Sequence, residues 1–243
     1  MLRIESVSKR FRSGNYGVRD VSFHANAGVL GLLGPNGAGK STLMQMIATV
    51  TKPTAGRIFF RDTDITANPD PLRRRLGYLP QDFGVYENLT AFEFLSYFAA
   101  LKGVRSRAKI QQMLELVNLH SVSGRAVGGF SGGMKQRLGI AQALINDPEL
   151  VIVDEPTAGL DPEERIRFRN VLVGLGEERL VILSTHIVSD VESIATQIAI
   201  MKSGSLAALA TPEQLLKQTG TVTLEAAFLR VVNSGTPVAQ AVA

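Results

Sequence analysis

One nine-residue segment constrains this chain more than any other feature, and it reads Gly34-Pro35-Asn36-Gly37-Ala38-Gly39-Lys40-Ser41-Thr42. It matches the pattern G-x-x-x-x-G-K-[ST], which cradles phosphate groups when it connects a strand to a helix. The flanking sequence fits that context, because residues 29–33 are apolar enough for a buried strand and residues 42–49 favour a helix. The segment therefore predicts a strand, a phosphate-binding loop and a helix in succession.

The residue types explain how such a loop would hold an anion. Glycines let the backbone approach a ligand closely and adopt positive φ, which a Cβ would resist. Successive backbone N–H groups then converge on the phosphates, and the helix N-terminus adds partial positive charge. Lys40 is expected to reach the β- and γ-phosphates, and the Ser41 hydroxyl to ligate Mg²⁺. A plain glycine-rich turn is the alternative, but the lysine, the hydroxyl and the context weigh against it.

Composition places the chain among ordinary globular proteins. A length of 243 residues, with 45% hydrophobic and 20% charged residues, suits one domain or a domain with an inserted lobe. No apolar run approaches the roughly 18 residues that a membrane-spanning helix needs, so we expect a soluble, intracellular chain. The absence of cysteine excludes disulfides and cysteine metal ligands. The net charge of +4 indicates a mildly basic surface, and we expect no nucleic-acid partner.

The predicted elements alternate between strand and helix on both sides of a helical middle segment. Strands are predicted at residues 29–33, 57–61, 76–80, 150–153, 181–184 and 198–201. Helices are predicted at residues 42–49, 71–75, 91–101, 110–117, 134–146, 163–172 and 187–194. Between about residues 83 and 147 the β-branched runs vanish. These patterns predict an α/β fold with a mostly parallel sheet covered on both faces and a helical lobe inserted into it.

The apolar strand predicted at residues 150–153 ends in two carboxylates, Asp154 and Glu155. A buried parallel strand delivers its last side chains to the carboxyl edge of the sheet, where nucleotides bind in such folds. We expect Asp154 to hold Mg²⁺, and Glu155 to orient and deprotonate the attacking water. The alternative is that these carboxylates cap the next helix, and Pro156 favours this for one of them.

Two further polar residues follow predicted strands. Gln81 comes after the strand at 76–80. A glutamine there could contact Mg²⁺ or the attacking water, and could signal to the helical lobe that a γ-phosphate is bound. His186 follows the strand at 181–184, and an imidazole at that edge could hydrogen-bond a γ-phosphate. Each residue alone is a weak signal, since glutamines usually solvate loops and lone histidines are more often structural.

A second anion site is predicted at the start of the helix at 134–146, which Ser131-Gly132-Gly133 precedes. A helix N-terminus offers free N–H groups, and here a hydroxyl and two glycines accompany them. Ser131 could instead be only an N-cap. That alternative would explain the serine but not the paired glycines.

Together these segments resemble the ATP-binding cassette (ABC) ATPases over residues 1 to about 230. Six motifs stand in family order: Walker A at 34–42, the Q-loop at Gln81, the signature at 130–134, Walker B at 150–155, the D-loop at Gly159-Leu160-Asp161 and the switch histidine at His186. Phe130 and Met134 replace the outer residues of the common signature Leu-Ser-Gly-Gly-Gln, while the serine and glycines that would face phosphate remain. The resemblance implies a P-loop NTPase core with a mostly parallel sheet, an antiparallel N-terminal β portion and an inserted α-helical lobe.

The resemblance also implies domain boundaries. It predicts a single ABC ATPase domain at residues 1–230, with its core at about 1–82 and 148–230, the helical lobe at about 83–147, and a C-terminal tail at 231–243. In the family an aromatic residue before Walker A stacks on adenine. Phe11 aligns best with that residue, and Tyr16 is the competing candidate.

The family mechanism would explain two anion sites in one chain. Two cassettes pair head to tail, and each ATP, with its Mg²⁺, lies between the Walker A motif of one chain and the signature helix of the other. Glu155 of one chain would then serve an ATP that Ser131 of the other completes, and Asp161 of the D-loop would join the nucleotide-binding residues. Because the closed dimer binds ATP better than ADP, hydrolysis would part the cassettes.

In transporters of this family the helical lobe docks a membrane subunit near the Q-loop. Residues 82–89 and the helix at 91–101 would form that surface here, with a separate polypeptide as partner. The resemblance thus places the chain peripherally at the cytoplasmic face of the cell membrane. The short segment at 223–229 and the run at 134–137 look most like cassettes of ABC-2-type exporters of drugs, peptides, lipids or polysaccharides.

Two other classes of function remain open. A cassette ATPase could act away from membranes in DNA repair, translation or iron–sulfur assembly, although the chain lacks the coiled-coil insertion or second Walker A motif typical of the first two. An unrelated P-loop kinase or GTPase is the other class. Gln81 and the Ser131 segment weigh against it, and no Asn-Lys-x-Asp motif is visible. Cofractionation with membranes would distinguish a transporter subunit from a repair factor.

Overall fold

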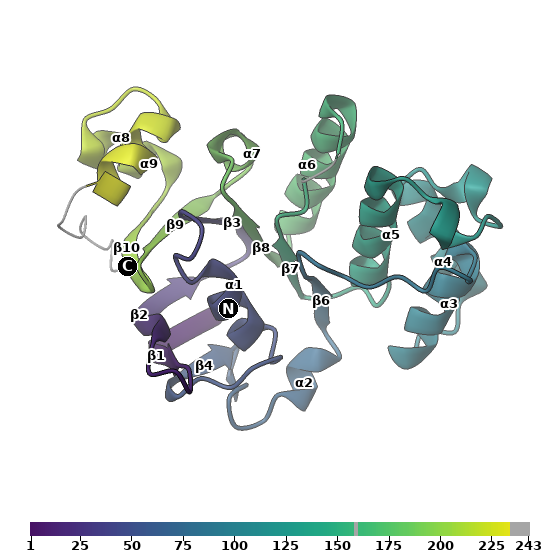
Figure 1. Cartoon of the computed structure of the whole chain (residues 1–243), viewed down its shortest axis with the longest axis horizontal. Helices are drawn as coiled ribbons and strands as arrows, with labels where there is room; N and C mark the ends of the chain where they lie inside the picture. The colour runs from purple at the N-terminus through teal and green to yellow at the C-terminus, as the bar shows by residue number, and fades with distance from the viewer. Residues whose placement is uncertain (158–159, 234–243) are drawn as a thin grey trace.

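The computed structural model describes residues 1–157 and 160–233, whose strands form two sheets (Figure 1). The smaller sheet is antiparallel, in the order β2-β1-β4-β5, and consists of β1 (Leu2–Arg10), β2 (Tyr16–Ala25), β4 (Ala55–Phe60) and β5 (Thr63–Asp64). The larger sheet has the order β10-β9-β3-β8-β7-β6. It consists of β3 (Gly28–Leu33), β6 (Leu76–Leu79), β7 (Leu150–Asp154), β8 (Leu180–Thr185), β9 (Gln197–Lys202) and β10 (Ser205–Ala210). The predicted combination of a mostly parallel sheet with an antiparallel N-terminal portion is confirmed.

Five strands of the larger sheet are parallel, and β10 alone runs antiparallel to its neighbour β9. Parallel strands end at the same edge of a sheet, so the segments that follow β3, β6, β7 and β8 emerge side by side. These segments carry the phosphate loop, Gln81, Glu155 and His186. Strand β10 was not predicted, because its sequence SLAALA has none of the β-branched or aromatic residues that favour strands.

Side chains of the parallel strands alternate between two separate cores, as the two-residue period of a strand requires. In β3, Leu30 and Leu32 pack with helix α1 (Lys40–Ile47) and the small sheet. Val29 and Leu33 of the same strand face the other way and pack with helices that follow β6 in the chain. Burial on both faces explains why these strands read as continuous apolar runs.

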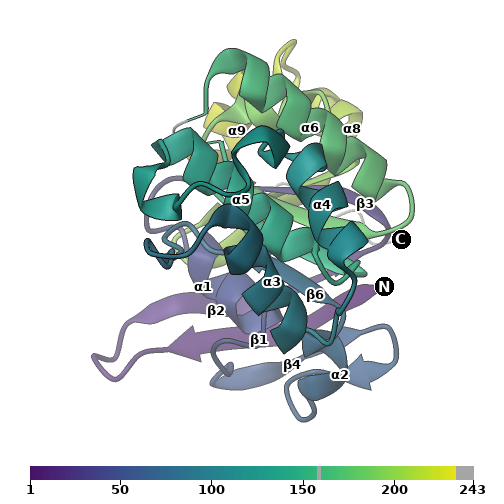
Figure 2. The same ribbon diagram turned by 90° about the vertical axis from the view of Figure 1, so that its right-hand side faces the viewer.

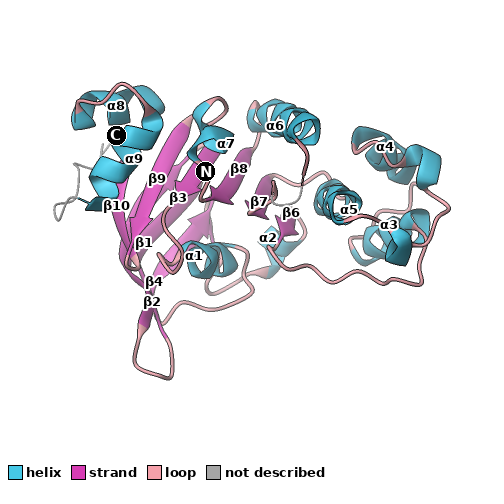
Figure 3. Ribbon diagram, turned by 45° about the horizontal axis from the view of Figure 1, so that its top comes forward, coloured by secondary structure: helices cyan, strands magenta, loops and turns pink. Residues whose placement is uncertain are grey.

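Helices cover both faces of the larger sheet. Figure 3 shows α1 and the short α2 (Asp70–Arg73) on one side, and α6, α7 and α8 on the other. The helices of the second group are α6 (Pro162–Gly176), α7 (Val188–Glu192) and α8 (Pro212–Thr219). The last helix of the described chain is α9 (Leu224–Asn233). The larger sheet, whose carboxyl edge carries the functional loops, therefore lies between two layers of helices.

Three helices between β6 and β7 gather beside the β6 edge of the sheet (Figures 1 and 2). They are α3 (Ala91–Leu101), α4 (Arg107–Leu116) and α5 (Gly132–Leu144). Helix α3 matches its prediction because Thr90 and Glu93 form a capping box that fixes its start. Throughout residues 1–157 and 160–233, no helix has the length and apolar character needed to cross a membrane.

The C-terminal helices α8 and α9 were not predicted, although α8 carries clear boundary signals. Thr211 and Gln214 form a capping box at its start, and Gly220 ends it in the left-handed conformation. Helix α9 continues through Asn233, past the boundary expected at residue 230. Residues 234–243 of the expected tail lie outside the described residues.

Candidate nucleotide-binding and catalytic site

The phosphate-loop segment connects β3 to α1 and forms the floor of a cleft of about 630 Å³. The residues that line this cleft come from the small sheet, the loop and the ends of three parallel strands: Phe11, Asn15, Tyr16, Gly17, Asn36, Gly37, Ala38, Gly39, Lys40, Ser41, Thr42, Gln81, Glu155 and His186. The structure thus brings the predicted loop together with Gln81, Glu155 and His186.

Close packing of three backbone segments fixes the start of α1. Gly39 has a φ of 100°, and a Cβ at this position would lie 2.3 Å from Gly17 O and 3.3 Å from Gly204 Cα. Only glycine satisfies both this conformation and this contact. Gly204 N also donates to Ala38 O at 2.9 Å, and its carbonyl accepts from Arg19 N at 2.7 Å. The loop is therefore held by β2 and by the β9–β10 turn.

Lys40 turns its side chain back along the loop. Its Nζ donates to Gly34 O at 2.7 Å and to Pro35 O at 3.3 Å, and the side chain is buried. Burial lowers the pKa of the Lys40 ammonium from its ordinary value, and the negative charges of Glu155 and Asp154 oppose that shift. A partly desolvated cation at the phosphate loop is well placed to bind phosphate.

Glu155 and His186 are in direct contact. His186 Nδ1 lies 2.8 Å from Glu155 Oε2, and the imidazole is mostly exposed while the carboxylate is buried. Glu155 itself directly follows β7, with a φ of 50°, and its N–H donates to Ser184 O at 2.9 Å. The backbone bond to β8 and the side-chain bond to His186 together fix the direction of this carboxylate.

The helix-capping alternative for the two carboxylates is excluded. Helix α6 has Asp161 as its N-cap, and Asp161 Oδ1 accepts a hydrogen bond from Glu164 N at 2.8 Å. Asp154 and Glu155 therefore do not cap this helix, and they lie at the carboxyl end of β7, where the sequence pattern predicts them.

Phe11 and Tyr16 both line the cleft, but their surroundings differ. The Tyr16 ring lies under two guanidinium groups, with Arg19 Cζ 4.7 Å and Arg10 Cζ 5.7 Å from its centroid. Such cation–π contacts occupy the faces of the ring. Phe11 packs beside Gly17, where a Cβ would come within 2.6 Å of Phe11 Cε2.

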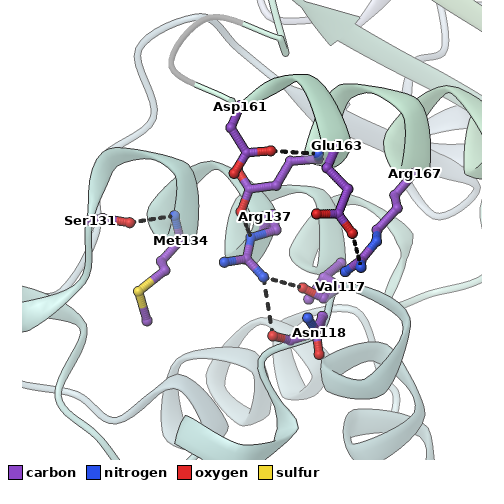
Figure 4. A network of polar contacts seen from close by, with 9 residues as sticks. Val117, Asn118, Ser131, Met134, Arg137, Asp161, Glu163 and Arg167 are labelled. Atoms are coloured by element: carbon purple, nitrogen blue, oxygen red, sulfur yellow. Dashed lines mark hydrogen bonds and ion pairs between the residues drawn. The ribbon is translucent and has the colours of Figure 1, made fainter.

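The second predicted anion site lies away from this cleft. Ser131, Gly132 and Gly133 stand at the start of α5, and Asp161 stands at the start of α6. Figure 4 shows Ser131 and Asp161 at these two helix starts. None of the four residues lines the cleft. Ser131 Oγ accepts a hydrogen bond from Met134 N at 3.2 Å, so the serine is an N-cap as well as a candidate ligand.

The two departures from the common signature sequence have structural roles in the lobe. Phe130 is buried in the core that the lobe shares with the helices of the larger sheet, and Met134 packs against that core from a half-buried position. Both residues thus anchor the segment that exposes Ser131. The first D-loop residue, Gly159, lies outside the described residues.

Sequence reasoning missed two residues of the cleft, Asn15 and Gly17. Both belong to the turn and strand that follow Phe11, and both line the cleft. The only local signal was the turn-forming run Ser13-Gly14-Asn15. The importance of Gly17 depends on its contact with Gly39, which is distant in sequence.

A family model described as ABC transporter matches residues 18–158, from β2 to just beyond Walker B. This chain belongs to the ABC transporter family. It is the ATP-binding subunit, and as an ABC ATPase it hydrolyses ATP.

Similar proteins carry the same description. The uncharacterized ABC transporter ATP-binding protein YxlF of Bacillus subtilis is 43% identical over 210 residues, covering 85% of this chain and 69% of YxlF. The Nod factor export ATP-binding protein I of Burkholderia pseudomallei is 36% identical over 221 residues, covering 88% of this chain and 71% of the relative. The dimeric structure of the bacterial ABC transporter cassette MJ0796 matches with a TM-score of 0.81 and 26% identity, over 87% of this chain and 98% of that one.

The ABC ATPase site contains groups that suit Mg²⁺. Asp154 is 3% exposed, and its Oδ1 has no hydrogen-bond partner within the described part of the chain. Burying a carboxylate oxygen without a partner is unfavourable unless a cation or a water molecule binds it. Ser41 and Gln81 line the cleft and add oxygen ligands of the type that Mg²⁺ prefers. Among residues 1–157 and 160–233 no three acidic, histidine or cysteine side chains form a metal cluster, so phosphate oxygens would complete the set.

Proposed function

We propose that this ABC ATPase works as a head-to-tail homodimer, in which each ATP lies between the cleft of one chain and the signature segment of the other. One observation carries the proposal: the cleft holds the phosphate loop, Gln81, Glu155 and His186, whereas Ser131 and Asp161 lie elsewhere in the same chain. A second copy in the reverse orientation supplies the missing half. The dimeric cassette MJ0796 supports this assembly.

The proposed roles follow from the contacts. Gly34 to Thr42 cradle the phosphates, and Lys40 neutralises their charge. Glu155 accepts the proton of the attacking water. His186 contacts the Glu155 carboxylate through Nδ1, and its imidazole also faces the γ-phosphate. Mg²⁺ would be bound by Ser41, Asp154 and Gln81, where its charge would stabilise the phosphate oxygens.

We assign the adenine contact to Phe11. Tyr16 is already covered by two guanidinium groups, whereas no ring or cation contact covers Phe11 among the described residues. Base stacking needs an accessible aromatic face. The exposed ring of Phe11 at the rim of the cleft provides it.

A separate membrane-spanning subunit is the proposed partner, and it would dock on the lobe at about residues 83–147. Tyr86, Tyr97 and Leu101 are exposed on and beside α3, close to the Q-loop segment that starts at Gln81. The rings of Tyr86 and Tyr97 lie 5.5 Å apart, and Phe98 supports Tyr97 at 5.4 Å. Exposed aromatic surface of this kind favours a protein partner. The chain would then lie at the cytoplasmic face of the membrane.

Export is the proposed direction of transport. The support is the likeness to a Nod factor export ATP-binding protein, which covers 88% of this chain. The transported substrate would be selected by the membrane subunit.

A mixing experiment tests the composite site. Lys40→Ala spoils the phosphate loop, and Ser131→Arg spoils the signature segment, so each variant alone should be inactive. In a mixed dimer the intact loop of the Ser131→Arg chain faces the intact signature of the Lys40→Ala chain, which restores one working site. We therefore expect the mixture to regain ATPase activity, up to about half that of the wild type for each mixed dimer. A mixture that stays as inactive as its components would refute the proposal.

A further inference from the structure

Arg137 connects the signature helix to the helix that follows the D-loop. It lies in α5 (Figure 4), and its Nε is 3.0 Å from Glu164 Oε1 in the first turn of α6. Each of the two side chains is only 20% exposed. An ion pair in this setting is less screened by water than an exposed one.

The same guanidinium group also binds backbone carbonyl groups at the C-terminus of a third helix, α4. Arg137 Nη1 donates to Val117 O at 3.0 Å and to Asn118 O at 3.1 Å, at the C-terminus of α4. A cation at this end is favourable because the helix carbonyls carry partial negative charge there. Arg137 therefore joins α4, α5 and α6 through one planar group.

The packing around this group is incomplete. A cavity of about 320 Å³ lies between the end of α4, helix α5 and the first turns of α6, and Arg137 and Glu164 are among its lining residues. Protein interiors normally set the spacing of helices by close packing. Since side chains do not fill this space, the polar contacts of Arg137 with Glu164, Val117 and Asn118 connect the three helices across it.

Both ends of the bridge lead to residues of the proposed composite site. Ser131 begins α5 six positions before Arg137, which is roughly 9 Å along a helix axis. Glu164 donates its own N–H to the N-cap Asp161 at 2.8 Å while its carboxylate pairs with Arg137. One residue thus fixes Asp161 through its backbone and α5 through its side chain.

We propose that Arg137 is a positioning residue, which sets the spacing between the signature helix and the D-loop helix so that Ser131 and Asp161 of one chain reach the partner's nucleotide together. This role rests on the proposed dimer. The Arg137–Glu164 pair does not touch the nucleotide of its own chain, because neither residue lines the cleft. Its loss should weaken dimer closure and turnover without weakening the first binding of ATP.

The test uses Glu164→Gln and Arg137→Gln in the full chain, with Arg167→Gln as the matched control. Arg167 pairs with Glu163 on the same helix, but both side chains are exposed at 58% and 75%. The measurements are ATP binding by dilute monomer, ATPase rate against protein concentration, and melting temperature. For Glu164→Gln and Arg137→Gln we expect ATP affinity within twofold of wild type and a roughly tenfold rise in the protein concentration that gives half-maximal rate. The double variant should be no worse than the more affected single variant, because both act through one contact.

Different results separate this proposal from the dimer itself. If the wild-type rate per chain does not depend on protein concentration, the dimer proposal fails first. If the wild type shows that dependence but Glu164→Gln behaves like Arg167→Gln, the positioning role of Arg137 is wrong. It is also wrong if Glu164→Gln lowers only the melting temperature, or if it lowers ATP affinity of the monomer by the same factor as the rate.

Discussion

The hydroxyl of Thr157 donates a 2.6 Å hydrogen bond to Asp190 Oδ2, and both side chains are almost completely buried. Thr157 follows Glu155 and Pro156 beyond β7, and Asp190 lies in α7, which follows His186. The bond therefore ties the segment of the catalytic glutamate to the segment of the switch histidine, behind their own contact at the cleft.

Loss of this bond should destabilise the fold. Thr157→Val keeps the side-chain shape but leaves a buried carboxylate without its donor, which we expect to cost about 3 kcal/mol of unfolding free energy. Thr157→Ser keeps the hydroxyl and is the control. The double variant Thr157→Val/Asp190→Leu should recover most of the loss, because neither polar group remains. Urea denaturation of the wild type, the three single variants Thr157→Val, Thr157→Ser and Asp190→Leu, and the double variant measures this, and additive losses in the double variant would contradict it.

Glu155→Gln should bind ATP and fail to turn it over. The amide retains a hydrogen bond with His186 but cannot accept the proton of the attacking water, so we expect the rate to fall at least about 100-fold. Without hydrolysis the proposed dimer should persist in ATP and elute as a dimer in size-exclusion chromatography. A near-normal ATPase rate in this variant would show that another group is the base.

Lys40→Met should raise thermal stability in the absence of nucleotide. Burial lowers the pKa of Lys40 below its ordinary value of 10.5, so the charged form is less favourable in the folded chain than in the unfolded chain. Between the folded and unfolded pKa values the unfolded chain binds more protons, and wild-type stability therefore rises with pH across that window. The gain from Lys40→Met should be greatest below the folded-state pKa of Lys40 and shrink as the pH rises toward 10.5. Melting curves of both proteins across this range check the sign, and a gain that is constant with pH would contradict it.

Two glycines of the phosphate loop should respond differently to alanine. Gly37 has a φ of 77°, and a Cβ added there would have no atom within 4 Å, so Gly37→Ala meets only conformational strain, about 1–2 kcal/mol. Gly39→Ala adds a clash with Gly17 O and must displace backbone. We expect Gly39→Ala to lose at least twice as much unfolding free energy, and to lose ATP binding. Equal losses in denaturation experiments would show that the contact with β2 is unimportant.

The choice between the two aromatic residues at the cleft can be tested directly. Phe11→Ala should weaken ATP binding by roughly tenfold, since stacking on a base is worth about 1–3 kcal/mol. Tyr16→Ala should have a smaller effect, because two arginines already cover that ring. Titration with ATP and with triphosphate alone separates base stacking from phosphate binding. A larger loss in Tyr16→Ala would reverse the assignment.

Much of the site could be predicted because each motif is a short contiguous segment. The phosphate loop, Glu155 and His186 each follow an apolar strand, and parallel strands place such segments at one edge. That rule predicts that Glu155 and His186 share one edge of the sheet, and their contact at 2.8 Å depends on the adjacency of β7 and β8, which the structure shows. The phosphate-loop helix nevertheless begins at Lys40, earlier than predicted, because the loop itself builds the first helical turn.

Other features could not be predicted because no local sequence pattern marks them. Thr157 and Asp190 are ordinary residues until the fold buries them together. Strand β10 is rich in alanine, and pairing with β9 rather than its own propensity makes it a strand.

The turn between β9 and β10 gives the C-terminal third of the chain a part in nucleotide binding without contact with nucleotide. Gly204 touches both the Walker A loop and β2, and leaves little space for a side chain at that junction. A chimera or truncation that replaced this hairpin would keep each of the six recognised motifs and still deprive the phosphate cradle of its rear support.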